Sequence, residues 1–318
     1  MSNILNRFLC IGQGVGNTGN PDCQFVPANI TGAILVPSSV EYTATQAATL
    51  DTVLVAAAKV DNAASRVYPI KRFRSMSDNS TDDTTNESGY GDITKMRSGK
   101  PVWQFELQDG LYSWSQLKAF DNQETQWSAL FMDEENNVVW GKGTSSGGFA
   151  GFPLNQLSVS TPKMNDGSNP FNYMITFGLK SVQDLQNFSL VQFDDSIAVM
   201  DMVDGLVTVQ PTIVSGATDT STTLQVRLLA AGTNMFTLYE SEFVAGGGTE
   251  FLVSVDGAAG VAATGCAATG GGADTFDITV AALSAAEVIT VTLAAPSVLE
   301  AASVPGYESA TSPSVTVV

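Results

Sequence analysis

The chain of 318 residues contains no histidine and only three cysteines, Cys10, Cys23 and Cys266. Histidine is the side chain that most often moves protons and binds metals near neutral pH, so its absence removes most hydrolytic triads and most zinc sites. A sparse and odd set of cysteines provides no disulfide framework. These absences favour a structural protein over an enzyme, and we expect no catalytic residue, no metal site and no cofactor.

The chain has few charged residues, and basic residues are rarer than acidic ones. Only 14% of the residues are charged, whereas typical domains have about 25%. The 14 Lys and Arg residues face 32 Asp and Glu residues, which gives a net charge of −18. Such a protein repels phosphate backbones, so we expect it not to bind nucleic acid tightly. The same repulsion would suit a wall past which DNA slides. The alternative is that the charge only confers solubility.

Long apolar runs are missing as well. No stretch of about 18 apolar residues is present, so we expect no insertion into a membrane. The apolar residues 8–11 are too few for the core of a secretory signal. We therefore expect a soluble protein made in a cytoplasm.

A change in composition divides the chain near residue 205. Residues 1–205 contain all four tryptophans, whereas residues 206–318 contain one basic residue, Arg227, and are rich in Ala, Gly, Thr and Val. We predict a mainly β first domain, a barrel or sandwich with one or two helices, followed by an all-β domain. The predicted parts are residues 1–205 (with an N-terminal arm, 1–30, and a long flexible loop, 75–92), residues 206–296, and a C-terminal tail, 297–318, which is mobile or docks as a strand.

Alternating apolar residues predict the strands of the first domain. Trp103, Phe105 and Leu107 alternate with polar residues, which indicates a strand with one buried face. The tryptophans are interpreted as core residues. A capping-box pattern, Thr43 to Gln46, precedes an alanine-rich segment and predicts a helix. The other predicted elements are a strand at 33–36, a short basic strand at 67–73, a helix at 113–119, and two hairpins, 126–132 with 138–140 and 157–163 with 171–179.

Basic residues flank the polar segment 75–92. This segment cannot bury enough apolar surface to order itself, and long loops in compact domains are usually functional or disordered. Lys71, Arg72 and Arg74 precede it, and Lys95 and Arg97 follow it. Basic strand ends with an acidic flexible tip favour an arm that contacts another molecule. A solvated loop is the alternative.

The second domain is predicted to be a β-sandwich. Its alternating segments lie at 224–228, 251–255, 276–280 and 289–293, and glycine-rich turns separate several of them. Short strands at this spacing are typical of immunoglobulin-like sandwiches. The likeness is one of pattern only, because the domain has no tryptophan and a single cysteine, Cys266.

Three motifs with known chemistry are interpreted as chance matches. The G-x-G-x-x-G pattern at residues 14–19 is not followed by the start of a helix. The S-x-x-K pairs Ser115 with Lys118 and Ser160 with Lys163 lack the companion motifs of serine–lysine enzymes. The acidic clusters lack the spacing of a calcium loop.

The order of elements from about residue 93 to residue 188 resembles that of the tail tube (major tail) proteins of tailed bacteriophages. A strand bearing a loop is followed by the alternating strand at 103–107, a small helix near 114–120 and hairpins that end at 171–179. Tube proteins share this order, and an appended immunoglobulin-like C-terminal domain is common among them.

This resemblance implies a self-assembling structural protein of the virion, with six-membered rings stacked into a tail tube whose acidic lumen lets DNA pass without sticking. The loop and the N-terminal arm would contact the next ring, with Lys71, Arg72, Arg74, Lys95 and Arg97 meeting acidic patches. The partners would be copies of the chain and other tail or head proteins, and assembly would occur in the bacterial host cytoplasm. The alternatives are a head-decoration or minor capsid protein and a cell-surface immunoglobulin-like adhesin.

Overall fold

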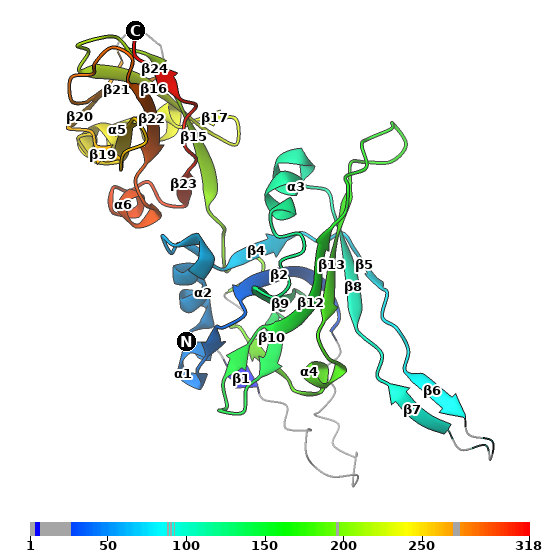
Figure 1. Ribbon diagram of the computed structural model, residues 1–318. Coiled ribbons are helices and arrows are strands. Elements are labelled where there is room, and N and C mark those ends of the chain that lie inside the picture. Colours follow the sequence, from blue (N-terminus) through cyan, green and yellow to red (C-terminus); the bar gives the residue numbers. More distant parts are fainter. Residues whose placement is uncertain are drawn as a thin grey trace. The chain divides into compact units, whose positions relative to one another are not determined.

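The computed structural model describes residues 4–6, 27–87, 89, 91, 93–194, 197–269 and 274–318 (Figure 1). It is mainly β, as predicted, and nearly all strand pairs are antiparallel. Contacts divide the chain into two compact units, Met1–Ala58 with Ala64–Asp204, and Lys59–Ala63 with Gly205–Val318. Among the described residues, no helix is both long and apolar enough to cross a membrane.

Strands dominate the N-terminal unit. They are β1 (Ile4–Asn6), β2 (Ile30–Pro37), β3 (Glu41–Tyr42), β4 (Tyr68–Lys71), β5 (Ser75–Asp78), β6 (Thr84–Glu87), β7 (Ile93–Arg97), β8 (Val102–Leu107), β9 (Trp127–Asp133), β10 (Val138–Gly143), β11 (Phe149–Ala150), β12 (Phe152–Val159), β13 (Tyr173–Leu179) and β14 (Phe188–Gln192). The helices are α1 (Ala44–Ala47), α2 (Leu50–Ala58), α3 (Gly110–Lys118) and α4 (Val182–Gln186), with a 3₁₀ turn at Ala63–Ser65.

One large curled sheet organises this unit. Its strands follow the order β1-β14-β10-β9-β12-β13-β8-β5, and β2 joins β9 to β4. Strand β12 pairs with β9 at its start and with β13 further on, so it links the two halves of the sheet. Strands from both ends of this order, such as β8 and β10, contribute to the same core. The sheet therefore closes around its own apolar face as a sandwich or partial barrel.

Strand β9 is buried on both faces because a second layer covers the sheet. Trp127 and Phe131 point into the core that the sheet encloses, whereas Leu130 and Met132 join a second core. Leu50 and Leu54 of α2 pack into that second core. Alternate side chains of β9 thus pack into two different cores. One is enclosed by the sheet itself, and the other lies between the sheet and α2.

Most predicted elements of this unit are confirmed. The strand at 33–36 is β2, the alternating strand is β8, and both predicted hairpins form, as β9–β10 and β12–β13. The capping box is present: Gln46 N donates to Thr43 Oγ1 over 3.2 Å, and Thr43 N donates to Gln46 Oε1 over 2.9 Å. Three of the tryptophans are buried in the core and the fourth, Trp114, packs against it.

The prediction of a long flexible loop at residues 75–92 is wrong for residues 75–78 and 84–87, which form β5 and β6. Strand β5 pairs with β8, and β6 pairs with β7. Backbone ladder bonds order these residues without a core, a possibility that composition alone does not reveal. Of the predicted N-terminal arm, β1 pairs with β14 and Ile30 begins β2; residues 1–3 and 7–26, including the glycine motif at 14–19, lie outside the described residues.

The C-terminal unit consists of two sheets that share one core. One has the order β20-β21-β16-β15-β23 with β17 beside β16, and the other has the order β19-β18-β22-β24. The bounds are β15 (Val207–Ser215), β16 (Thr223–Ala230), β17 (Thr233–Asn234), α5 (Phe236–Ala245), β18 (Phe251–Val255), β19 (Val261–Ala262), β20 (Gly265–Ala268), β21 (Phe276–Thr279), β22 (Val288–Leu293), α6 (Pro296–Ala301), β23 (Tyr307–Ser309) and β24 (Val315–Thr316). The predicted sandwich is present, but the unit is not all-β as predicted, because it also contains the helices α5 and α6.

Of the two alternatives predicted for residues 297–318, a mobile tail or a docking strand, the structure shows the second, because these residues complete both sheets of this unit. Strand β23 pairs in parallel with β15, and β24 pairs with β22. Two serine hydroxyls accept hydrogen bonds from β22: Leu293 N donates to Ser309 Oγ over 2.7 Å, and Val291 N donates to Ser312 Oγ over 2.8 Å. The small polar residues that suggested mobility are used to satisfy the backbone of a neighbouring strand.

Hydrogen bonds to Asp133 connect the residues just before β2 to the β9–β10 turn. Its buried carboxylate accepts hydrogen bonds from Ala28 N over 2.8 Å and from Asn136 Nδ2 over 2.8 Å. We expect Asp133→Ala to lower the free energy of unfolding by about 2–4 kcal/mol, because it leaves partly buried donors without an acceptor. Urea unfolding measures this loss. The exposed neighbour is the control: Glu135→Ala should change stability by less than about 0.5 kcal/mol.

Candidate assembly surface

The described residues of the segment 79–100, here called the hairpin arm, form a ribbon that continues β5 and β8 (Figure 1). Asn79 N donates to Val102 O over 2.8 Å, and Thr81 N donates to Lys100 O over 3.0 Å. Beyond these bonds, β6 and β7 pair only with each other among the described strands. Gly99 is required in the arm because a Cβ at that position would overlap Thr81 O. The described part of the arm is therefore a hydrogen-bonded pair of strands and not an irregular loop.

Apolar side chains on the arm and at its base face solvent. Every residue of β5, β6 and β7 is exposed. Met76 is 43% exposed, Ile93 72% and Met96 67%. Strand β6 offers Ile93 and Met96 on β7 no apolar partner, since its sequence is Thr-Thr-Asn-Glu. Exposed apolar residues gathered on one projection mark an interaction site, whereas scattered ones do not.

The arm also carries charges of both signs. Lys95 on β7 forms an ion pair with Asp83 across the ribbon. The Lys95 ammonium and a hydrogen bond from the Gly99 amide hold the pKa of the Asp83 carboxyl below its ordinary value. Arg97 lies opposite Thr84 in the register. The charge of Lys95, one of the predicted contact residues, is thus neutralised by an acidic residue of the same chain.

The other predicted basic residues lie where β4 leads into β5. Lys71 Nζ lies 2.7 Å from Asp204 Oδ1. Arg72 has φ of 65°, in the left-handed region that few residues other than glycine adopt. Burial raises the pKa of Asp109 above its ordinary value, and the charges of Arg72 and Arg74 partly oppose that rise. The charges of these two arginines therefore act on the Asp109 carboxylate.

A small aromatic cavity adjoins this connection. Its volume is about 310 Å³. Trp103, Trp140 and Phe73 line it together with Arg74 and Met76. It lies at the base of the hairpin arm, since Met76 belongs to β5. A cavity with aromatic walls and one cation at its rim suits an apolar side chain that is flanked by an acid.

The structure separates the five predicted contact residues into two groups. Lys71, Arg72 and Arg74 lie at the β4–β5 connection, whereas Lys95 and Arg97 lie on β7. In the part of the chain that the structure describes, β7 pairs with β6 alone and β4 with β2 alone, and Figure 1 shows the two strands well apart. The sequence analysis missed Ile93 and Met96. Their signal was an apolar pair in a strand whose partner strand is entirely polar.

Three side chains of the two S-x-x-K matches, those of Ser115, Lys118 and Ser160, form hydrogen bonds with other partners. Ser115 Oγ donates to Tyr112 O over 2.7 Å, and Lys118 Nζ donates to Asp121 Oδ2 over 2.7 Å. Ser160 Oγ accepts from Met174 N over 2.9 Å. Neither pair has the direct contact that a nucleophile and its base require.

Comparison of the sequence with models of protein families and with curated protein sequences found no match.

Proposed function

We propose that this chain is a self-assembling structural protein of a virion, of the kind that forms the stacked rings of a bacteriophage tail tube. Its function is then to build a wall from many copies and not to catalyse a reaction. Other tail or head proteins would be its further partners, and assembly would take place in the bacterial host cytoplasm.

The hairpin arm is the observation that carries this proposal. It extends from the curled sheet, its backbone is ordered by ladder bonds, and Ile93 and Met96 are exposed at 72% and 67%. A monomer gains nothing from holding two large apolar side chains in water. A copy of the same chain that covers them would gain the free energy of burying both.

The open edges of the sheet support the same proposal. Strands β4 and β5 each pair on one side only within the described part of the chain. Monomeric proteins usually protect such edges, and closing them against the next subunit removes the hazard of uncontrolled pairing. In a ring, the edges of neighbouring copies would join into a continuous inner sheet.

The charge balance suits DNA as cargo. With a net charge of −18, the assembled wall would repel the phosphate backbone, so DNA would pass without being held. Of the five predicted contact residues, Lys71 and Lys95 already form ion pairs within the chain. Arg72, Arg74 and Arg97 would then serve contacts between subunits.

Purified full-length protein is expected to form rings or stacked tubes at micromolar concentration. Burial of strand edges and of the arm in each copy provides the driving force. Negative-stain electron microscopy shows the particles, and sedimentation velocity measures the share of chains in them. Raising the salt concentration should favour assembly, because it screens the repulsion between acidic subunits.

Other outcomes would point to the alternatives. Protein that stays monomeric at high concentration and binds glycans would contradict the proposal and favour an adhesin. Protein that stays monomeric but attaches to bacteriophage heads would favour a decoration protein.

A further inference from the structure

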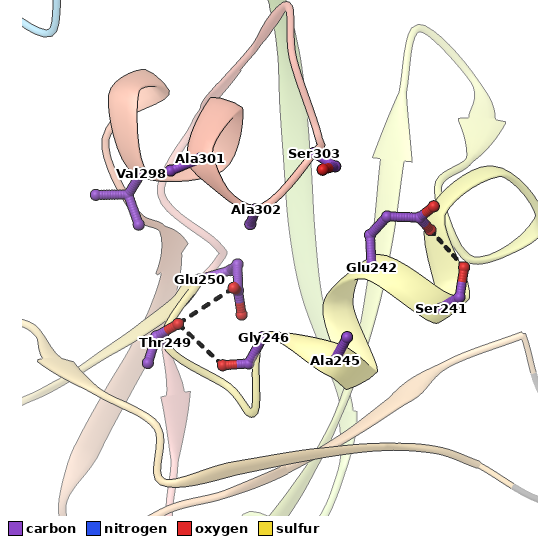
Figure 2. Close-up of a pocket in the computed structure, with 10 residues that line it drawn as sticks. All are labelled: Ser241, Glu242, Ala245, Gly246, Thr249, Glu250, Val298, Ala301, Ala302 and Ser303. Atoms are coloured by element: carbon purple, nitrogen blue, oxygen red, sulfur yellow. Dashed lines mark hydrogen bonds between the residues drawn. The ribbon is translucent and has the colours of Figure 1, made fainter.

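A cavity of about 660 Å³ lies within the C-terminal unit, between the end of α5 and α6 (Figure 2). Its size falls within the range of about 300–1,000 Å³ that small-molecule sites occupy. The α6 side is aliphatic and is formed by Val298, Ala301 and Ala302. The carboxylates of Glu242 and Glu250 contribute the charged part of the lining. The lining of the cavity therefore combines an aliphatic surface with negatively charged side chains.

Glu250 is the unusual group in this cavity. Its residue is only 1% exposed, and Figure 2 shows its carboxylate at the centre of the lining residues. Thr249 Oγ1 donates to Glu250 Oε1 over 3.1 Å. Within the part of the chain that the structure describes, the buried Oε2 has no hydrogen-bond partner. A buried carboxylate oxygen without a donor is unfavourable, so a missing partner is indicated.

The chain makes room for this carboxylate. A Cβ at Gly246 would overlap the carboxylate of Glu250. Only glycine at this position therefore lets the acid lie against the backbone that follows α5. The carboxylate thus lies in the space that the missing side chain of Gly246 leaves, and Thr249 donates to it.

The electrostatic surroundings favour a cation. Residues 206–318 contain ten acidic residues and a single basic one, Arg227. The field of such a unit raises the local concentration of cations. An N–H donor on a positive ligand would form a charge-assisted hydrogen bond with Glu250 Oε2.

We propose that this cavity binds an organic cation, an ammonium or guanidinium group carried on an aliphatic chain. The cationic group would donate to Glu250. Glu242, whose Oε2 accepts from Ser241 Oγ over 2.7 Å, adds negative charge to the lining. The methylene chain would pack against Val298, Ala301 and Ala302. Free diamines and guanidines share this chemistry with the side chains of lysine and arginine in a protein partner. The inference is independent of the proposed role in assembly.

Isothermal titration calorimetry of the full-length protein tests the inference with agmatine, 1,5-diaminopentane and the tripeptide acetyl-Gly-Arg-Gly-amide. Saturable binding of one cation per chain is expected. Glu250→Gln should weaken it by about tenfold or more, because a charge-assisted bond becomes a neutral one. The unliganded variant should melt at the same temperature or higher, because a buried charge without a full set of partners has been removed.

Glu240→Gln is the matched control. Glu240 belongs to the same helix, α5, and is exposed outside the cavity, so the variant makes the same change in charge and should bind normally. Tighter binding of the tripeptide than of agmatine would identify a protein side chain as the source, and the reverse order a free amine or guanidine. If Glu250→Gln fails to fold, Glu242→Gln provides the second test. Absence of binding at millimolar cation, equal binding by Glu250→Gln, or binding of Ca²⁺ alone would overturn the inference.

Discussion

Replacing residues 82–99 by Asn-Gly is expected to give a folded protein that no longer assembles. The replacement joins Thr81 to Lys100, which already face each other, since Thr81 N donates to Lys100 O over 3.0 Å and Lys100 N donates to Thr81 Oγ1 over 2.9 Å. Asn-Gly is the preferred two-residue turn for joining antiparallel strands. Because no side chain of the removed segment belongs to a core cluster of the described residues, the melting temperature should stay within a few degrees.

The loss of assembly follows from the side chains that the replacement removes. If Ile93 and Met96 become buried against another copy, each contributes about 1.5–3 kcal/mol to every contact. Losing both weakens each contact by more than about 100-fold, since 1.4 kcal/mol corresponds to a factor of ten. Sedimentation velocity of the variant and the parent protein at equal concentration measures the change.

A double variant separates the apolar side chains from the arm as a whole. Ile93→Ser with Met96→Ser keeps the arm, its charges and its ladder, and it should reduce assembly nearly as strongly. Thr85→Ser on the polar strand β6 is the control and should assemble normally. Normal tubes from the shortened protein would show that the arm is not an assembly contact, and the proposed function would lose its main support.

The elements that bury one face were predictable from the sequence. Trp103, Phe105 and Leu107 alternate with polar residues because β8 has one face on the core and one on solvent. Thr43 and Gln46 specify a helix start through bonds within four residues. In both cases the decisive contacts are local, or repeat with the period of the strand, so a single sequence reveals them.

The elements that satisfy only backbone groups were not predictable. Strands β5 and β6 are ordered by ladder bonds to β8 and β7, and their side chains carry no pattern. For the last residues the sequence left a mobile tail and a docking strand both open. The hydroxyl groups of Ser309 and Ser312, which bind them to β22, are equally common in mobile tails, so composition could not decide between the two.

The candidate sites depend on distance in space. Glu250 faces α6, about fifty residues further along the chain, and the aromatic cavity joins residues of β5, β8 and β10. The five basic residues adjoin one predicted loop in sequence, but the ribbon places them in two groups. Proximity in the sequence did not predict proximity in space, because the residues on a hairpin lie far from those at its base.

Phe131→Ala is expected to destabilise the N-terminal unit by about 3–5 kcal/mol. Phe131 is fully buried on β9, between Ala33 of β2 and Trp140 of β10. Its ring lies within 5.1–6.1 Å, centroid to centroid, of five others, those of Trp103, Phe105, Trp140, Phe152 and Phe177. Truncation removes one ring from the middle of this cluster, and the rigid strands around it cannot close the cavity.

Tryptophan fluorescence during urea unfolding measures this loss in the unit concerned. All four tryptophans lie in residues 1–205, so the signal reports on the N-terminal unit alone. Such a loss is a large share of the 5–15 kcal/mol by which domains are stable. Leu111→Ala is the control, because Leu111 is half exposed on α3 and its truncation should cost less than about 0.5 kcal/mol. A loss below about 1 kcal/mol for Phe131→Ala would mean that the aromatic cluster is not the centre of this unit's stability.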